Sequence, residues 1–524
     1  MKLSRIVSLL LALALCFSLS AIGEAASTWI SDELVEITIM RADNANAPMS
    51  NSALKWEWIE ELLNVRIILE TPPKADYESK KNTLIATDNM VDIMHVSSSD
   101  VKTWARDDMF VNLSEHEDEM PNMFKVLASD VRYQMLTVDG DFYGAPVIQR
   151  VSPETRPSGQ LVNFRVDLLE KYNIATPTTW DELFDAIKLI QENEPDLIGI
   201  TNRKGGSITA TRKMLDCMAY PLGSGSTMYY DEDLGGVWVY GPANENFKAV
   251  LSYLNKCFEA GVLDPDYASM TKDSWVEKLS SGKAICTVDN DGVVRDYNLA
   301  LQTIDENYKI DVIPTLTNSL GQTRNFEYDV DWVTEAYVIA TSSEHIDVCI
   351  KYLDWCYSDY GADVNGFGKE GVSYDYVDGR PQIKEEYLAK HKDSSQASTD
   401  LCVELGVGLL DITPYVDIGA QEQMSYYQKT PEELAAFKAQ VAAIGSDKGL
   451  RAPSIAPSFT EEQTERYNEL LLAVENIVWQ EIDKYITGEE PIENYDKVIE
   501  AARAAGAEEM EKIYNDAWNA ALGK

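Results

Sequence analysis

Histidine is scarce in this chain, and the familiar catalytic motifs are missing. The sequence of 524 residues contains four histidines, which are isolated from one another: His95, His116, His345 and His391. It has no G-x-S-x-G, H-E-x-x-H, C-x-x-C or G-x-x-x-x-G-K segment and no complete G-x-G-x-x-G segment. These absences argue against a serine hydrolase, a zinc peptidase, a thiol oxidoreductase and a nucleotide-binding enzyme.

One pair of acidic residues keeps a catalytic alternative open. Asp289 and Asp291 lie two positions apart in "ICTVDND", at the predicted end of a strand, so both could face one cleft. Two carboxylates are the minimum for cleaving a glycosidic bond. Such a pair arises readily by chance among 87 acidic residues. A secreted carbohydrate-active enzyme is therefore the alternative, not the leading hypothesis.

Long apolar runs are missing beyond the N-terminus. There, basic residues precede an apolar run over 6–19, and a stretch of small residues follows. The run is shorter than the ~20 residues that span a bilayer, and the whole pattern predicts a secretory signal peptide over 1–26. We therefore expect an extracellular protein, secreted or associated with the cell surface. A lipid anchor at Cys16 is not expected, because the bulky Leu15 stands where a lipidation signal has a small residue.

Basic residues are few relative to acidic ones. The chain has 45 lysines and arginines against 87 acids, a formal net charge of −42. A field of that sign repels polyanions at long range. The charge therefore argues against binding to nucleic acid or to an anionic membrane surface.

Cysteine is also sparse for a chain of this length. Besides Cys16 there are six: Cys217, Cys257, Cys286, Cys349, Cys356 and Cys402. An even number permits disulfides in a secreted protein, but a chain this long does not need them for stability. We expect buried free thiols.

What the sequence does contain is an alternation of short β-rich segments with amphipathic helices, which predicts an α/β fold. The expected strands are Glu36–Met40, Val65–Glu70, Asp92–Ser97, Ala284–Asp289, Ile310–Ile313 and Ala336–Thr341. In "PTTWDELFDAIKLI", Thr179 is predicted to cap a helix whose Glu182 reaches back to the Thr179 amide. Trp180 begins an apolar stripe at helical spacing, so we place it in the core.

Aromatic residues are plentiful, with 11 tryptophans and 27 tyrosines beside many polar residues. A pyranose has an apolar face that stacks on aromatic rings and hydroxyls that need hydrogen-bonding partners. Composition alone is weak support, because most of these rings belong to the core. It is nevertheless compatible with sugar binding.

Six segments follow one another along the chain: "VDGDFYGAPV", "NFRVDLLEKYNIATPTTWDELFDAI", "FKAVLSYLNKCFEAGVLDPDYASM", "EKLSSGKAICTVDN", "YVIATSSEHIDVCIKYLDWCYSDYGADVNGFGKEGVSYDYVDGRP" and "YITGEEPIENYDKVIEAARAAGAEEMEKIYNDAW". In this order they resemble the family 1 extracellular solute-binding proteins, and among them the large members typical of Gram-positive bacteria. The resemblance implies a two-lobed periplasmic-binding-protein-like fold of type II, with a sheet flanked by helices in each lobe. It also implies a monomer that holds an oligosaccharide between the lobes and delivers it to an ABC transporter permease powered by an ATPase. A peptide-binding receptor remains a second alternative.

The same resemblance implies how the chain divides between the lobes. Lobe 1 would contain 27–145 and 309–380, and lobe 2 would contain 146–308 and 381–524, including the C-terminal helices. Strands that cross between the lobes would form a hinge.

Candidate ligand-binding residues come partly from the resemblance and partly from strand ends. "GKAICTVDND" is similar to a strand-to-helix turn that points at the ligand in this family. In open α/β sheets, other strand ends also offer polar groups to ligands. Aromatic residues near these segments, but outside a helical stripe, are candidates for stacking on sugar. The candidates are Asp289, Asn290, Asp291, Arg41, Asp43, Ser97, Ser98, Trp275, Trp332 and Tyr229.

No cofactor or metal is expected. Many large relatives carry a D-x-N-x-D-G calcium loop after the "TWDEL" helix. Here the chain reads "QENEPDLIGI", which has neither the length nor the oxygen spacing of such a loop.

Overall fold

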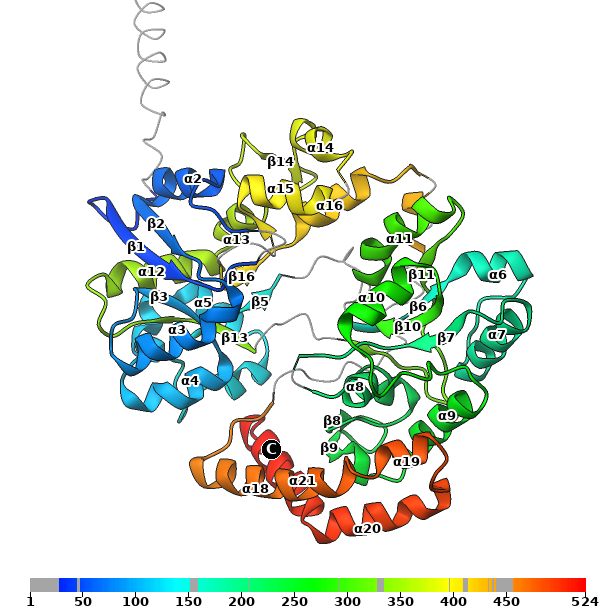
Figure 1. Cartoon of the computed structure of the whole chain (residues 1–524). Helices are drawn as coiled ribbons and strands as arrows, with labels where there is room; N and C mark the ends of the chain where they lie inside the picture. Colours follow the sequence, from blue (N-terminus) through cyan, green and yellow to red (C-terminus); the bar gives the residue numbers. More distant parts are fainter. Residues whose placement is uncertain are drawn as a thin grey trace, which may run out of the picture.

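The computed structural model describes residues 28–524 except 45–47, 151–158, 207, 291, 328–333, 395, 409–412, 432, 436–437 and 440–455. The predicted signal peptide and Cys16 lie outside these residues. The described chain forms two lobes, each with its own sheet, and a group of C-terminal helices that runs along both (Figure 1). No helix in the described ranges is both long and apolar enough to cross a membrane.

The first lobe contains a five-stranded mixed sheet of order β2-β1-β3-β13-β4. Its strands are β1 (Val35–Met40), β2 (Val65–Glu70), β3 (Ile93–Ser97), β4 (Ala145–Pro146) and β13 (Glu335–Ile339). β1 pairs in parallel with β2 and β3, whereas β13 runs antiparallel to β3 and β4. The expected strands of this lobe are confirmed to within two residues at each end.

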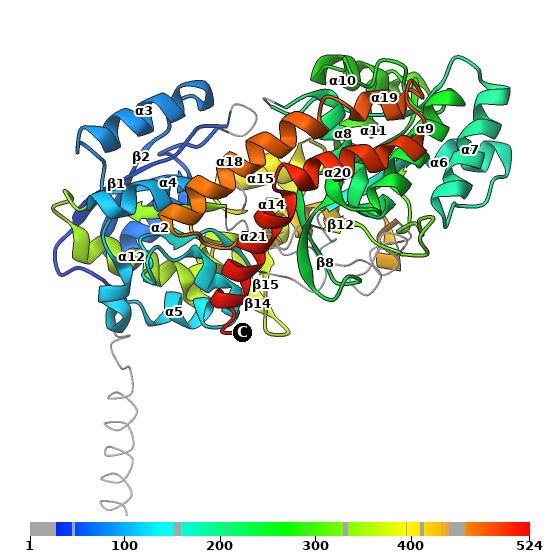
Figure 2. The same cartoon turned by 90° about the horizontal axis from the view of Figure 1, so that it is seen from below.

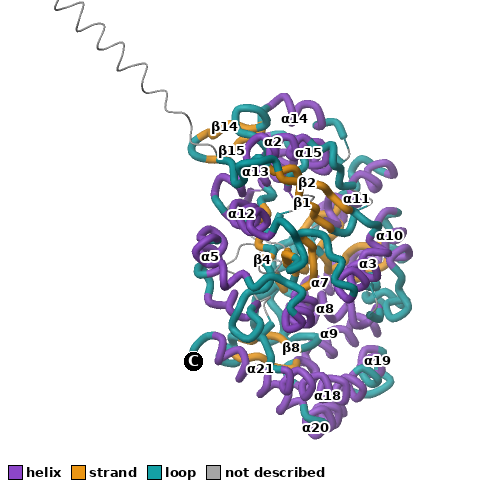
Figure 3. The backbone as a smooth tube through the Cα atoms, turned by 90° about the vertical axis from the view of Figure 1, so that its left-hand side faces the viewer, coloured by secondary structure: helices purple, strands orange, loops and turns teal. Residues whose placement is uncertain are grey.

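Helices cover both faces of the first sheet because its side chains alternate between two apolar clusters. Ile37, Ile39 and Ile93 face one cluster, whereas Met40 and Met94 face the other. Figure 3 shows α12 and α3 on opposite sides of β1 and β2. The helices of this lobe are α2 (Leu54–Leu63), α3 (Lys74–Ala86), α4 (Ser98–Trp104), α5 (Pro121–Leu127), α12 (Ile346–Tyr357) and α13 (Asp359–Phe367).

The second lobe contains a sheet of order β11-β6-β10-β7, with β12 also paired to β6. Its strands are β6 (Gly159–Arg165), β7 (Ile198–Thr201), β10 (Ala284–Asp289), β11 (Ile310–Val312) and β12 (Phe326–Glu327). β10 and β7 are parallel, so their carboxyl ends lie at one edge of the sheet. The flanking helices are α6 (Val166–Tyr172), α7 (Trp180–Asn193), α8 (Ala210–Leu222), α9 (Phe247–Glu259), α10 (Lys272–Ser280) and α11 (Gly292–Ile304).

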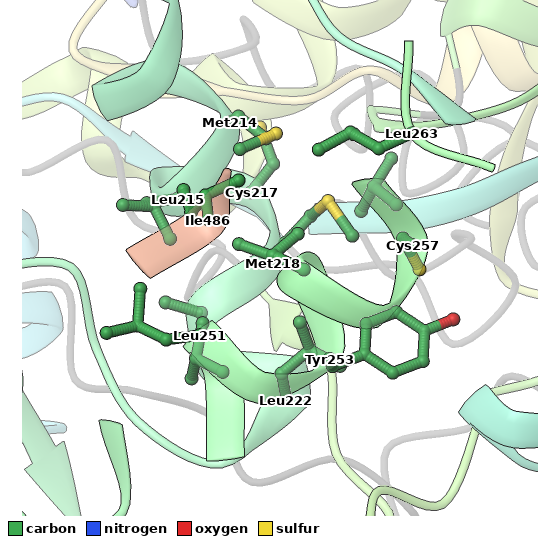
Figure 4. Close-up of a cluster of buried hydrophobic side chains, with 14 of the residues drawn as sticks. Met214, Leu215, Cys217, Met218, Leu222, Leu251, Tyr253, Cys257, Leu263 and Ile486 are labelled. Carbon is green, nitrogen blue, oxygen red and sulfur yellow. The ribbon is translucent and has the colours of Figure 1, made fainter. Parts of the chain in front are cut away.

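The core of the second lobe packs α8 and α9 together under the sheet. Met214 and Met218 of α8 meet Leu251 of α9, and Ile486 of the C-terminal helix α19 (Ile482–Ile486) lies beside them (Figure 4). Cys217 and Cys257 are in the same cluster, and all six cysteines after Cys16 are buried and free, as predicted. Trp180 is buried here too, and Thr179 caps α7. The Glu182 carboxylate was predicted to accept from the Thr179 amide. It accepts instead from the backbone amide and the hydroxyl of Thr178, one residue earlier.

Parts of two segments lie in a different lobe from the one the sequence indicated. Residues 309–380 were assigned to lobe 1, which holds for β13 and α12, but β11 and β12 at the start of the segment pair with β6 in the second sheet. Residues 381–524 were assigned to lobe 2, but their first part packs on Trp58 of the first lobe. That part contains α14 (Glu385–His391), α15 (Ala397–Leu405), β16 (Tyr415–Val416) and α16 (Gly419–Tyr427), and it follows the hairpin of β14 (Tyr374–Val377) and β15 (Arg380–Ile383). Strand pairing and packing partners are long-range contacts that the local sequence pattern does not encode.

The C-terminal helices contact both lobes. They are α18 (Glu461–Val478), α19 (Ile482–Ile486), α20 (Asp496–Ala504) and α21 (Ala507–Ala521). Figure 2 shows α18 running across the molecule and α21 lying at an angle to it, toward the C-terminus. Val474 belongs to the second-lobe core, whereas Trp518 belongs to the first. Trp238, on the hairpin of β8 (Met228–Asp231) and β9 (Val237–Tyr240), lies 5.4 Å from Trp518 between ring centroids. This aromatic contact connects the β8–β9 hairpin to the C-terminal helix α21.

Candidate functional site

Asp289 ends the central strand β10 of the second sheet, and its carboxylate is fully engaged. Every residue of β10 is buried, and Asp289 is 2% exposed. Its Oδ2 accepts from Arg203 Nε at 2.5 Å and its Oδ1 from Arg203 Nη2 at 3.1 Å. The backbone amide of Asn290 also donates to Oδ1, at 2.8 Å. Asp289 therefore acts on its surroundings through Arg203, and its own oxygens are not open to a ligand.

Arg203 is the group that this pair presents outward. β7 ends at Thr201, and Thr201 is paired in register with Thr287 of β10, which places Arg203 beside the end of β10. The Arg203 side chain is 25% exposed while Asp289 is buried. Its guanidinium carbon also lies 5.8 Å from the centroid of the Trp275 ring. An arginine held by a buried carboxylate and an aromatic ring is a preorganised hydrogen-bond donor.

Trp275 is part of the layer beneath this pair. It is 5% exposed, packs edge-on against Tyr297, and donates its Nε1 hydrogen to Thr287 Oγ1 at 3.1 Å. Thr287 Oγ1 in turn donates to the Thr201 carbonyl at 2.9 Å. The sequence proposed Trp275 as a ring that stacks on sugar. The structure instead gives it the role of support, because its faces are covered by protein.

Tyr229, another ring that the sequence proposed to stack on sugar, is also covered by protein. Its side chain is 4% exposed, its hydroxyl donates to Asp231 at 2.8 Å, and its ring packs edge-on against Tyr220. Two further candidates, Asp291 and Trp332, lie outside the described residues. Asn290 is half-buried, and its side-chain amide donates to Asp289 Oδ1.

The candidates at the ends of the first sheet form a second polar group. Arg41 follows β1 and donates from Nη1 to the Tyr337 hydroxyl at 3.2 Å. On the neighbouring strands, His95 Nε2 and Glu335 Oε2 lie 3.1 Å apart. The hydrogen bond from His95 lowers the pKa of Glu335, and burial lowers the pKa of His95. Asp43, two residues after Arg41, accepts from the backbone amide of Met49.

Ser97 is the N-cap of α4, and Ser98 is the first residue of that helix. The Ser97 hydroxyl accepts from the Asp100 amide, and the Asp100 carboxylate accepts from the Ser97 amide, which is a complete capping box. Asp100 also accepts from the buried Lys81 at 2.7 Å. The Ser98 amide donates to the Thr334 carbonyl. Both serines are half-buried, so the structure places them at the predicted strand end but commits Ser97 to capping.

A third charged group lies where the chain leaves the first lobe. Arg150 follows β5 (Ile148–Gln149), which pairs in parallel with β16. Its Nη1 lies 2.5 Å from Asp363 Oδ1 and 3.6 Å from Asp417 Oδ2, and the Tyr376 hydroxyl donates to Asp363. Burial raises the pKa of Asp417 to about 6. Arg150 thus lies within ion-pair distance of both Asp363 and Asp417.

Sequence reasoning missed Arg203. The signal was present in "IGITNR", a short β-branched segment followed by polar residues, but it was not recognised as a strand. Had it been, the rule that placed Arg41 and Ser97 at strand ends would have named Arg203 as well.

Metal ligands do not gather in the parts of the chain that are described, where no three His, Cys, Asp or Glu residues could hold an ion. In the connection from α7 to β7, Glu194 Oε1 accepts from Lys171 Nζ and from the Tyr172 hydroxyl, each at 2.6 Å. That carboxylate already has partners within the protein.

Known proteins match this chain along most of its length. The polygalacturonan/rhamnogalacturonan-binding protein YtcQ of Bacillus subtilis (strain 168) is 23% identical over 498 residues, which are 94% of this chain and 92% of that protein. Lipoprotein LipO of the same organism is 20% identical and covers 87% of each chain.

Solved structures share the fold. The alginate-binding protein AlgQ2 has a TM-score of 0.68 at 17% identity and covers 94% of this chain and 99% of its own. A solute-binding protein for HMO from Bifidobacterium longum infantis has a TM-score of 0.68 at 16% identity, covering 93% and 99%. These matches confirm the two-lobed fold that the sequence indicated. The family of bacterial extracellular solute-binding proteins matches residues 59–362, and this chain belongs to it.

Proposed function

We propose that this protein is the substrate-binding component of an ABC importer, which captures an oligosaccharide between its lobes and passes it to a membrane permease. The observation that carries the proposal is the relationship to YtcQ, which extends through both lobes of this chain and whose name states a polysaccharide ligand. The strand ends of both sheets offer the polar groups that sugar hydroxyls need as partners. A ligand that touches both lobes favours the closed state by its greater affinity for that state.

Delivery to a permease requires the protein to be outside the cell. The extracellular family supports this location. We expect the mature chain to begin near Ala26 or Ser27, and to act as a monomer. N-terminal sequencing of secreted protein checks the start, and a chain that begins at a lipidated Cys16 would contradict it.

Cleavage of the ligand is not part of the proposal. A glycosidase would need Asp289 as an acid, base or nucleophile facing the sugar. In the structure the two oxygens of Asp289 accept hydrogen bonds from Arg203 and Asn290, and the side chain is buried. An acid so placed is suited to orienting Arg203 and not to proton transfer with a ligand.

A thermal-shift screen of purified protein against oligosaccharides tests the proposal. A ligand that binds only the folded protein raises the melting temperature, by an amount that grows with ligand concentration above Kd. Chromatography of the ligand after a day's incubation then tests for cleavage. Binding without shortened products supports a transport receptor; shortened products would favour the enzyme, and no shift with any sugar or with peptides would remove the receptor function.

A further inference from the structure

We propose that Glu335 binds hydroxyl groups of the oligosaccharide from the first lobe and that His95 positions Glu335 for this contact. The inference rests on the oligosaccharide-binding function proposed above, and it adds a specificity-determining acceptor that the sequence did not indicate. His95 is a positioning residue, because it acts through Glu335.

The place of Glu335 in the first sheet is the first argument. It is the first residue of β13, and the chain reaches it soon after leaving β12 of the second sheet. Its register partner is Ser97, the last residue of β3. Because β1 and β3 are parallel, Glu335 lies at the edge of the sheet where their carboxyl ends meet. Ligands of open α/β sheets bind at this edge.

The exposure of the carboxylate is the second argument. The Glu335 side chain is 41% exposed, and its Oε2 lies 3.1 Å from His95 Nε2. Within the described ranges, Oε1 has no hydrogen-bond or ion-pair partner. An ionised carboxylate accepts hydrogen bonds at both oxygens and donates none. It therefore suits ligand groups that donate, such as sugar hydroxyls, and it repels a ligand carboxylate.

The fixed position of the pair is the third argument. The His95 side chain is 11% exposed, and its ring lies 5.1 Å from the Tyr337 ring between centroids. Because a carboxylate only accepts, His95 donates to Glu335 from Nε2. An exposed side chain that is already held loses less conformational entropy when a ligand binds. Support of this kind from a buried neighbour is what a specific recognition group requires.

The charges around the pair keep Glu335 ionised. The hydrogen bond from His95 lowers the pKa of Glu335, and the cations Arg41 and Lys74 act in the same direction. Burial lowers the pKa of His95, and Arg41 and Lys81 add to that effect. At neutral pH the pair is therefore a neutral imidazole and a carboxylate. A hydrogen bond to a charged acceptor is stronger than one to a neutral acceptor.

Calorimetry across a pH range tests the inference. The probes are tetramers of galactose, of mannose and of galacturonate, and the tetramer that the parent binds most tightly is used with the variants. Glu335→Gln keeps the size of the side chain but removes its charge, so it should weaken binding about 10- to 100-fold at pH 7. On acidification the affinity of the parent should fall toward that of Glu335→Gln, because protonation removes the same charge. The affinity of Glu335→Gln should change little.

Two variants of His95 test its positioning role. His95→Ala removes the donor, so the pKa of Glu335 rises and the loss of affinity on acidification should begin at a higher pH than in the parent. His95→Gln keeps a donor and should restore most of the affinity at pH 7. A residue with a purely structural role would lower the melting temperature without moving the pH at which affinity falls.

Glu119→Gln is the matched control. Glu119 also pairs with a histidine, His116, at 2.9 Å, and its side chain is 47% exposed. It ends the 3-10 turn Leu113–Glu119 and is not at a strand end of the sheet. Glu119→Gln should leave affinity unchanged at every pH. Melting temperatures show that each variant is folded.

Each outcome decides for or against the inference. Weaker, pH-independent binding by Glu335→Gln, absent in Glu119→Gln, supports it. If Glu335→Gln binds the tetramer as tightly as the parent, or if both lose affinity in parallel on acidification, the inference is overturned while the receptor function stands. If His95→Ala titrates like the parent, the positioning role is overturned. If the parent binds no oligosaccharide here or in the thermal-shift screen, the proposed function falls, and the inference with it.

Discussion

The strand ends of the two sheets use similar residues in opposite ways. In the first lobe the cation is buried: Lys81 lies beneath Asp100, which also completes the cap of α4. In the second lobe the acid is buried and the cation reaches outward, since Asp289 is enclosed and Arg203 is a quarter exposed. The buried Asp289 therefore fixes the position of a partly exposed arginine. In the first lobe, by contrast, the buried Lys81 forms ion pairs with Glu78 and Asp100, and these pairs stabilise the lobe.

The largest effect we expect comes from removing the support of the outward pair. Trp275→Ala deletes a buried indole and should lower the free energy of unfolding by about 3–5 kcal/mol. It should also weaken oligosaccharide binding, because Arg203 loses the ring beside it. Urea unfolding and calorimetry measure the two effects. Trp275→Phe is the control, which keeps most of the packing and loses the hydrogen bond to Thr287, at a cost of about 1 kcal/mol. A cost below about 1 kcal/mol for Trp275→Ala would contradict the buried role of this ring.

Breaking the inward pair should change stability without changing binding. Asp100→Ala removes the carboxylate that accepts from the Ser97 amide in the capping box, and it leaves the buried Lys81 paired only with the exposed Glu78. We therefore expect a loss of about 3 kcal/mol. The side chain of Glu78 is 71% exposed against 18% for Asp100. Glu78→Ala should therefore cost about 0.5 kcal/mol. If Asp100→Ala weakened ligand binding as strongly as Trp275→Ala, the contrast between the two strand ends would be wrong.

Arg150 of the first lobe lies near two carboxylates, Asp363 and Asp417, and the titration of Asp417 gives a pH-dependent prediction. Burial raises the pKa of Asp417 to about 6, above the ~3.9 of aspartate in an unfolded chain. The folded protein thus holds this proton more tightly. The resulting stabilisation is complete below about pH 4 and is lost as the pH rises through about 6.

Asparagine at position 417 carries no charge. Asp417→Asn should therefore be more stable than the parent by about 3 kcal/mol at pH 8 and nearly equal to it at pH 4. Arg150 keeps Asp363 as its close partner. Unfolding curves across this pH range measure the difference. Asp375→Asn, on an exposed strand of the same lobe, serves as the control and should show no such trend. A constant difference at all pH values would mean that Asp417 does not titrate in this window.

The contrast between the lobes could be predicted only in part from the sequence. The sequence pattern predicted β1, β2, β3 and β13 of the first sheet and β10 and β11 of the second, whereas β6 and β7 were missed. Polar groups were predicted at the carboxyl ends of β1, β3 and β10. Which of those groups are already satisfied could not be predicted, because the partners of Asp289 and Ser97 are fixed by tertiary packing or by local capping. The burial of Trp275 and Tyr229 was missed for a related reason. Outside a clean helical stripe, a core ring and an exposed ring look alike in sequence.

The smallest effect we expect is that of a chelator. α7 ends at Asn193 and β7 begins at Ile198, so the connection is far shorter than the ~12-residue loop that encloses calcium through side-chain and backbone oxygens. Glu194, an acid in that connection, already accepts from Lys171 and Tyr172, and the hydrogen bond from Lys171 lowers its pKa. We therefore expect EDTA to shift the melting temperature by less than about 1 °C, well below the ~2–4 °C that a loss of ~1 kcal/mol produces in a domain of roughly 150–250 residues. Re-addition of calcium after chelation is the control. A drop of several degrees that calcium reverses would contradict this expectation and would reveal a calcium site.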